Sequence, residues 1–228
     1  MSEVRVIQIN ESIFAENGRD AQRIREQMTR QETLFLNFMS SPGSGKTTVL
    51  VALINRLKET LKIGEMDVDI ESSLDAQRVA DRTGIPCLQI HNGGLCHIDA
   101  DMTARALAQV DTSDLDLLIL ENIGNLVCPA EFDTGAHQNI SILSVPEGDD
   151  KPLKYPLMYR VSDVVLINKI DTLSYFDFDL EKARERILKL NPNAWIFPIS
   201  AKTGEGLDAV CDWILQKVKQ IKEAAKEA

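Results

Sequence analysis

The sequence is poor in cysteine and histidine and contains no long hydrophobic run. Its 228 residues include four scattered cysteines and three histidines, too few for the dense disulfide framework of a small secreted domain. No apolar run approaches the roughly 20 residues of a transmembrane helix, and the first residues, MSEVRVIQINESIF, lack the apolar core of a secretory signal. We therefore expect a reduced, cytoplasmic protein without a membrane partner.

Basic residues are also outnumbered, and the formal net charge is −10 at pH 7. Non-specific binding to nucleic acid needs a basic surface that displaces counterions, so we expect no nucleic-acid partner. The 44% of hydrophobic residues and the 26% of charged residues are ordinary for a soluble globular protein, and this length can bury a sizeable core.

Short apolar runs alternate with amphipathic segments, and this alternation predicts βαβ units. We expect strands at 34–39, 62–70, 86–90, 115–124, 139–146, 162–171 and 194–200. We expect helices at 17–32, 47–61, 74–84, 99–110, 178–191 and 206–228. The pattern is typical of an α/β fold whose mostly parallel sheet is flanked by helices, with ligands beyond the carboxyl ends of the strands.

The first residues differ from the remainder of the chain because they are polar and charged. Ala21, Ile24 and Met28 recur there at the helical spacing of three and four. We predict a helical arm over residues 1–33 that leads into one α/β domain over residues 34–228.

The stretch SSPGSGKTT lies between a predicted strand and a predicted helix, and it indicates a phosphate-binding loop. Residues 40–47 fit the pattern G-x-x-x-x-G-K-[ST], except that Ser40 replaces the first glycine. Lys46 would supply a cation to the β and γ oxygens, and Thr47 would offer a hydroxyl to Mg²⁺. The predicted contacts with the nucleotide in this loop are Pro42, Gly43, Ser44, Gly45, Lys46, Thr47 and Thr48.

The motif NKID follows the apolar run DVVLI and is typical of a guanine-reading site. Asp171 would accept hydrogen bonds from the ring N1–H and the exocyclic amine, and the Lys169 stem would pack along the base. SAK, after the next strand, matches the GTPase motif that lends a backbone N–H to the guanine O6. The order of the three motifs favours GTP over ATP. The predicted base contacts are Asn168, Lys169, Asp171, Ser200, Ala201 and Lys202.

The strand at 115–124 ends in ENIG, where GTPases place a carboxylate for Mg²⁺ and a turn that faces the γ-phosphate. Glu121 is the expected carboxylate and Gly124 the turn of the second switch. Asp69 is a second candidate near Mg²⁺, and either acid could instead be a solvated carboxylate at a strand end. The predicted catalytic residues are Lys46, Thr47, Asp69, Glu121 and Gly124, with Thr47, Asp69 and Glu121 around Mg²⁺.

The sequence gives little sign of fast catalysis. No glutamine suited to orient an attacking water follows Gly124, so we expect slow hydrolysis of GTP to GDP and phosphate, raised by dimerisation or a partner. Lys154, in the predicted loop EGDDKPLKYP, would supply positive charge to a nucleotide across a dimer interface; the alternative is an exposed loop lysine.

Two cysteines lie at the carboxyl edge of the predicted sheet. Cys96 and His97 follow one strand and open the next predicted helix, and Cys128 lies four residues beyond Gly124. Thiolate and imidazole ligands suit zinc, and also nickel when the geometry flattens. Three ligands are one short of a closed site, which a two-fold dimer would complete. The spacing leaves open two buried cysteines and a helix-capping histidine.

Five segments together closely resemble the HypB family of GTPases, which assist nickel insertion into [NiFe]-hydrogenase. They are SSPGSGKTT, GGLCHIDA, ENIGNLVCP, SVPEGDDKPLKYP and INKID. The resemblance implies a P-loop NTPase fold and a cytoplasmic homodimer that uses GTP/GDP and Mg²⁺. It also implies a Ni²⁺ or Zn²⁺ site at Cys96, His97 and Cys128. The implied partners are the nickel-binding accessory protein HypA and the precursor of the hydrogenase large subunit.

The chain departs from the family pattern in its first-switch stretch, MDVDIESSLDAQR. Val68 stands where the usual G-D-x-x-T pattern has glycine, which leaves the role of Asp69 open. The alternatives are a urease-type nickel GTPase, a regulatory or targeting GTPase with structural cysteines, and an ATP-dependent kinase. The urease-type motif is Cys-Pro-His, whereas Cys128 and Pro129 are followed here by Ala130, and NKID disfavours the kinase.

Overall fold

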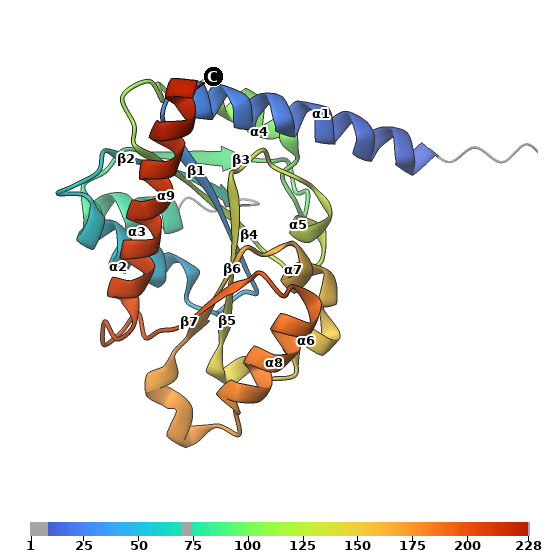
Figure 1. Cartoon of the computed structure of the whole chain (residues 1–228), viewed down its shortest axis with the longest axis vertical. Helices are drawn as coiled ribbons and strands as arrows, with labels where there is room; N and C mark the ends of the chain where they lie inside the picture. The colour runs from blue at the N-terminus through green and yellow to red at the C-terminus, as the bar shows by residue number, and fades with distance from the viewer. Residues whose placement is uncertain (1–8, 70–73, 228) are drawn as a thin grey trace, which may run out of the picture.

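The fold is a parallel sheet with helices on both faces, and a computed structural model describes it for residues 9–69 and 74–227 (Figure 1). Seven strands lie in the order β3-β2-β4-β1-β5-β6-β7, and every neighbouring pair is parallel. The strands are β1 (Leu34–Ser40), β2 (Ile63–Asp69), β3 (Cys87–His91), β4 (Leu117–Gly124), β5 (Gln138–Ser144), β6 (Val164–Asn168) and β7 (Trp195–Pro198). The expected α/β class is confirmed.

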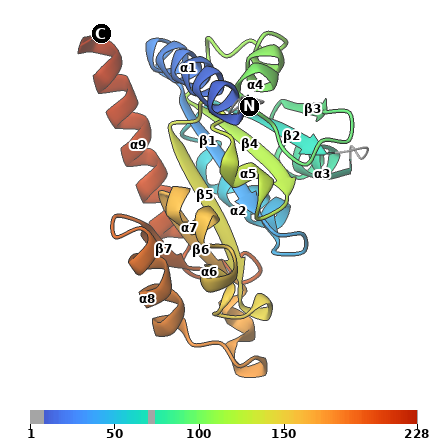
Figure 2. The ribbon, with the colours of Figure 1, turned by 90° about the vertical axis from the view of Figure 1, so that its right-hand side faces the viewer.

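Helices connect the strands and cover both faces of the sheet, as the turned view in Figure 2 shows. The α-helices are α1 (Ile9–Arg30), α2 (Lys46–Leu57), α3 (Leu74–Thr83), α4 (Ala100–Leu107), α5 (Cys128–Glu131), α6 (Lys151–Lys154), α7 (Pro156–Val161), α8 (Leu180–Leu190) and α9 (Leu207–Glu227). Two short 3₁₀ helices are η1 (Val145–Glu147) and η2 (Ile170–Tyr175). In the part of the chain that the structure describes, none of these helices is both long and apolar enough to cross a bilayer.

Strand β1 lies at the centre of the sheet, and all of its residues are buried. Leu36 and Phe38 belong to the core that includes apolar residues of α2 and α9, whereas Phe35 belongs to the core that includes residues of α1 and α4. Successive side chains of a strand point to opposite faces, so a strand covered on both faces is apolar throughout. This explains the continuous run LFLNFM and places the loop that follows β1 at the middle of the carboxyl edge.

The helix expected at 17–32 is confirmed within α1. Its predicted apolar positions Ala21, Ile24 and Met28 are buried against the sheet, and Arg25 forms hydrogen bonds to Asp133 and to the backbone of Ala136. The helix therefore packs into the same core as the strands. The division of the chain at residue 33 stays a prediction, and residues 1–8 lie outside the described part.

Two local expectations are wrong. Helix α4 begins at Ala100, because the Asp99 side chain accepts a hydrogen bond from the Met102 N–H and caps it. Cys96 and His97 therefore lie in the loop before this helix rather than at its start. The stretch expected as a loop around Lys154 contains α6 and the start of α7, because prolines occupy their first turns without losing a hydrogen bond.

Candidate nucleotide and metal sites

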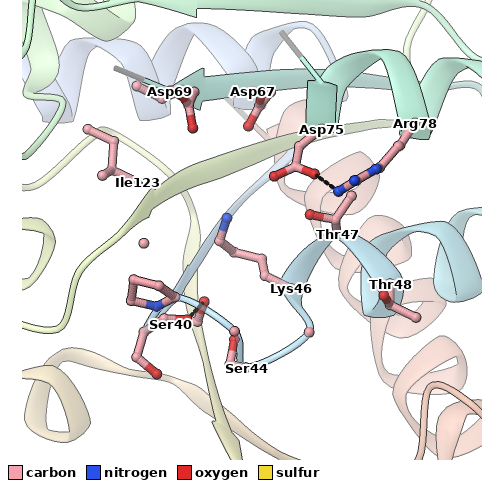
Figure 3. Close-up of a pocket in the computed structure, with 16 residues that line it drawn as sticks. Ser40, Ser44, Lys46, Thr47, Thr48, Asp67, Asp69, Asp75, Arg78 and Ile123 are labelled. Carbon is pink, nitrogen blue, oxygen red and sulfur yellow. Dashed lines mark hydrogen bonds and ion pairs between the residues drawn. The ribbon is translucent and has the colours of Figure 1, made fainter. Parts of the chain in front are cut away.

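The predicted phosphate loop surrounds a cavity of about 490 Å³ at the carboxyl end of β1 (Figure 3). Its volume lies within the range of about 300–1,000 Å³ that is common for small-molecule sites. Gly45 caps α2 with a φ of 96°, a left-handed conformation that glycine adopts without strain, and α2 therefore points its N-terminus into the cavity. All the predicted loop residues line it: Pro42, Gly43, Ser44, Gly45, Lys46, Thr47 and Thr48.

Glu121 holds the two reactive side chains of the loop. One of its carboxylate oxygens, Oε1, accepts hydrogen bonds from Lys46 Nζ at 2.8 Å and from Thr47 Oγ1 at 2.8 Å. Glu121 is fully buried within β4, so the alternative of a solvated carboxylate at a strand end is wrong for this residue. A phosphate that attracts Lys46 must compete with this carboxylate.

The expected switch turn contacts the phosphate loop. A Cβ added to Gly124 would lie 3.3 Å from the backbone nitrogen of Pro42, so the two segments pack closely and a side chain there would force one of them to shift. Asp69, at the end of β2, lines the same cavity, and Figure 3 shows it across from the loop. Ile70 and the three residues that follow it in the first-switch stretch lie outside the described residues.

The residues around the cavity fit Mg²⁺. The second oxygen of Glu121, Oε2, is buried and has no hydrogen-bond partner among the described residues. The Thr47 hydroxyl is bonded to the same carboxylate, and Asp69 faces the same space. Hydroxyl and carboxylate oxygens are ligands that Mg²⁺ prefers.

The two guanine motifs meet beside the phosphate loop. Asn168 Nδ2 donates to the Ser44 carbonyl at 3.0 Å, and its Oδ1 accepts from the Ala201 N–H at 3.1 Å. Lys169 Nζ donates to the Gly43 carbonyl at 2.7 Å. A second cavity of about 210 Å³ is lined by Thr172 and by seven residues of the loop and of both motifs: Gly45, Thr48, Asn168, Lys169, Asp171, Ala201 and Lys202. Ser200 is buried and does not line this cavity, and it donates to Asp171 Oδ1 at 2.7 Å.

The thiols of Cys96 and Cys128 also come together. Their sulfur atoms are 2.7 Å apart, Cys96 is exposed, and both thiols are free. Their hydrogen bond raises the pKa of the Cys128 thiol. Two thiolates at ~2.3 Å from a tetrahedral ion lie roughly 3.8 Å apart, so an ion between them would push the sulfur atoms apart. The alternative that both cysteines are sealed in the core is wrong.

His97 stands to one side of the thiol pair. Its Nδ1 is 3.9 Å from Cys96 Sγ, and its ring stacks on Phe132 with a centroid distance of 3.9 Å. The aromatic contact continues to Phe14 of α1, whose ring centroid is 5.5 Å from that of Phe132. Phe132 was not predicted from the sequence, and its position four residues after Cys128 gave no signal of this contact.

Lys154 does not reach the nucleotide cavity of its own chain. Its Nζ pairs with Asp150 at 2.6 Å on the exposed face of α6, and its predicted role across a dimer interface stays a prediction. Lys151 lies nearer to the switch turn, because it lines a cavity together with Pro42, Gly124 and Glu147. Sequence reasoning missed this lysine, since both lysines sit in one polar stretch.

Two buried acids of β2 were also missed. Glu65 and Asp67 are each 2% exposed. Burial, with the charge of Glu121, raises the pKa of Glu65 to about 8 and that of Asp67 to about 7. Alternation in the sequence GEMDVD places these acids on the face that also carries Asp69, which is the signal that could have found them.

This fold and this loop define a P-loop nucleotide-binding protein, since a phosphate loop follows the central parallel strand and opens α2. A model of the CobW/HypB/UreG nucleotide-binding domain matches residues 34–198. The chain belongs to this family, and the curated relatives below place it in the HypB branch, as its motifs predicted.

Three relatives illustrate the likeness. The hydrogenase maturation factor HypB of Escherichia coli (strain K12) is 41% identical over 214 residues, which cover 94% of this chain and 73% of that protein. The hydrogenase/urease maturation factor HypB of Helicobacter hepaticus is 41% identical over 218 residues, which cover 94% and 89%. The crystal structure of HypB from Helicobacter pylori in complex with nickel superimposes with a TM-score of 0.84 at 39% identity, covering 90% of this chain and 96% of that chain.

Proposed function

We propose that this protein is a GTP-hydrolysing metallochaperone that assists nickel delivery during [NiFe]-hydrogenase maturation. The observation that carries the proposal is the position of the thiol pair. Cys128 begins α5 four residues after Gly124, and Gly124 packs against the phosphate loop. A metal ligand and the turn that senses the terminal phosphate therefore share one short piece of backbone.

The nucleotide side of the proposal begins with the base. Asp171 would accept from the two donors of guanine, while Asn168 and Lys169 join the base site to the phosphate loop through their hydrogen bonds to Ser44 and Gly43. These hydrogen bonds would fix the position of the base site relative to the phosphate loop. The specificity for GTP over ATP rests on Asp171, because adenine lacks the donor pair that a carboxylate recognises.

Lys46 would contact the phosphates directly, and Thr47 would contact them through Mg²⁺. Lys46 would transfer from Glu121 to the β and γ oxygens, while Thr47, Glu121 and Asp69 would hold Mg²⁺, which supplies charge neutralisation at the phosphates when bound. We propose slow intrinsic turnover, because no described glutamine or arginine lines the cavity beside Gly124; Arg78, on the opposite wall, is paired with Asp75 at 2.8 Å.

Nickel would be the transported ion, and it would bind at the thiol pair. Cys96 and Cys128 would provide thiolate ligands, and His97 an imidazole on the same loop as Cys96. The thiols lie at the surface, so a two-fold related copy could bring its own ligands to the same ion. We propose a homodimer linked by nucleotide and metal, working in the cytoplasm with HypA and the hydrogenase large-subunit precursor as partners. Zn²⁺ would compete for the same ligands.

A titration of Ni²⁺ tests the coupling. The protein is loaded with GDP or with a non-hydrolysable GTP analogue, and Ni²⁺ binding is followed by calorimetry. We expect the two affinities to differ by roughly 5- to 150-fold, the usual range of coupling between two sites. Equal affinities in the two nucleotide states would contradict the proposal.

Cysteine variants separate the proposed function from a regulatory GTPase with structural cysteines. We expect Cys96→Ser and Cys128→Ser to lose nickel binding while nucleotide binding persists. Cys87→Ser is the matched control, because Cys87 lies on β3 away from the thiol pair and burial keeps its thiol protonated by raising its pKa. A regulatory GTPase would retain partner binding in all three variants.

Urease is a second candidate recipient, because one relative is named a hydrogenase/urease maturation factor. The metal site would be the same and the recipient would differ. Transfer of radioactive nickel from the loaded protein to the hydrogenase large-subunit precursor, compared with transfer to urease apoprotein, distinguishes the two recipients.

A further inference from the structure

Three carboxylates from two neighbouring strands meet beneath the phosphate loop. Asp67 of β2 is in register with Glu121 of β4, and Glu65 lies two residues earlier on the same face of β2. One oxygen from each of the three acids lies within 4.8 Å of the others, and all three residues are buried. We call Glu65, Asp67 and Glu121 the carboxylate cluster.

The oxygens of this cluster lack partners. Both oxygens of Glu65, one oxygen of Asp67 (Oδ2) and one of Glu121 (Oε2) are buried without a hydrogen-bond partner among the described residues. Cys87 of β3 is in register with Glu65, and its thiol donates to the Ile85 carbonyl at 3.7 Å and also interacts with the Glu65 carboxylate. Native structures rarely leave buried acceptors unpaired, because each loses its hydrogen bonds to water without replacing them.

The charge balance of the cluster leads to the same conclusion as its unpaired oxygens. Among the described residues, Lys46 is the cation that forms an ion pair with the cluster, and its partner is Glu121. One positive charge cannot balance three buried carboxylates, so the cluster must hold either protons or a second cation.

We propose that Glu65, Asp67 and Glu121 form a binding site for a hard divalent cation of the Mg²⁺ or Mn²⁺ type. Carboxylate oxygens are the donors that such ions prefer, and oxygen ligands at ~2.1 Å from an octahedral ion lie roughly 3–4 Å apart. The spacing of the cluster is therefore compatible with a shared ion. Asp67 also lines the nucleotide cavity, which provides a route for the ion and its waters.

This site goes beyond the proposed nucleotide function. The Mg²⁺ of a nucleotide would sit among Thr47, Asp69, Glu121 and the phosphates, so Glu121 would lie between the two ions, whereas Glu65 does not line the nucleotide cavity at all. An ion in the cluster would bind without nucleotide. It would also neutralise Glu121 when Lys46 turns to the phosphates, so it would favour nucleotide binding.

Mn²⁺ is the probe, because its electron paramagnetic resonance signal distinguishes free from bound ion. Full-length protein without nucleotide is titrated with Mn²⁺. We expect one bound ion per chain and at least tenfold weaker binding in Glu65→Gln, since removing a charged ligand lowers the affinity of an oxygen site. Glu59→Gln is the matched control, because it removes the same charge from an exposed position between α2 and β2, outside the cluster. We expect it to bind Mn²⁺ as the wild type does.

Thermal unfolding provides a second readout. A bound ion stabilises the folded state, so Mn²⁺ should raise the unfolding midpoint of the wild type and not that of Glu65→Gln. If Glu65→Gln fails to fold, Asp67→Asn takes its place. Absence of Mn²⁺ binding at millimolar concentration, or equal binding by wild type and variant, overturns the proposal and means that the cluster holds protons. Neither readout involves GTP hydrolysis or nickel, so the outcome is independent of the proposed function.

Discussion

At the scale of single residues, Gly43 and Gly45 share a left-handed backbone but differ in their surroundings. Their φ angles are 78° and 96°. A Cβ at Gly43 would have no atom within 4 Å, whereas a Cβ at Gly45 would lie 2.8 Å from Asn168 Nδ2. The Gly45 position is therefore restricted both by its backbone and by the guanine motif that packs on it.

We expect Gly45→Ala to lower the free energy of unfolding more than Gly43→Ala does. Both variants incur about 1–2 kcal/mol for a left-handed alanine, and Gly45→Ala adds roughly 1–3 kcal/mol for the overpacked contact with Asn168. Urea unfolding without nucleotide measures the difference, because phosphate contacts then play no part. Equal losses would show that Asn168 moves aside freely.

At the scale of elements, α1 connects the two segments that carry the thiols. Asn17 Nδ2 donates to the Asp133 carbonyl at 3.0 Å, beyond α5, and its Oδ1 accepts from the Ala100 N–H at 2.8 Å, at the start of α4. One side chain therefore holds together the loop after Cys128 and the loop that ends at α4. The helix also presents Phe14 to the ring of Phe132.

We expect Asn17→Ala to weaken Ni²⁺ binding about tenfold and to leave nucleotide affinity unchanged. Two lost hydrogen bonds cost about 1–3 kcal/mol, part of which appears as disorder of the loops that carry Cys96 and Cys128. Gln22→Ala is the control, since the side-chain hydrogen bonds of Gln22 stay within α1, with Glu26 and Arg25. Competition with a coloured nickel chelator measures the affinity, and an unchanged value in Asn17→Ala would mean that the loops hold their positions without α1.

At the scale of the whole molecule, His137 makes folding sensitive to acid. Its Nδ1 accepts from the Phe35 N–H at 2.9 Å, and its Nε2 lies 3.0 Å from Thr29 Oγ1, so the ring joins β1 to α1. Burial, together with the charge of Arg25, lowers the pKa of His137 to about 4. The unfolded chain therefore binds more protons than the folded chain between about pH 6.5 and 4.

This histidine should lower stability as the pH falls through that window. The expected loss is about 3 kcal/mol between pH 7 and pH 4. Glu65 and Asp67 act in the opposite direction, because their raised pKa values add stability at low pH that is lost as the pH rises towards 8. The comparison with His137→Gln cancels their effect. Denaturant unfolding across the pH range should show a steeper acid loss in the wild type, and parallel curves would contradict the assignment.

The sequence predicted the order of strands and helices well because hydrophobic period and turn residues act locally. The phosphate loop and NKID could be found for the same reason, since each motif is one continuous stretch. The carboxylate cluster could not, because Glu65 and Glu121 are 56 positions apart and meet only through the register of β2 and β4. The Phe132 contact with His97 and the link through Asn17 likewise depend on tertiary packing, which periodicity does not encode.

The order of strands in the sheet sets the direction in which a bound nucleotide would lie. The guanine motifs follow β6 and β7 on one flank of β1, and the thiols follow β3 and β4 on the other. The base would be anchored at the end remote from the cysteines, and the chain of phosphates would run towards them. GTP and GDP would therefore bind alike at the base, and they would differ only in the number of phosphates that extend towards the cysteines.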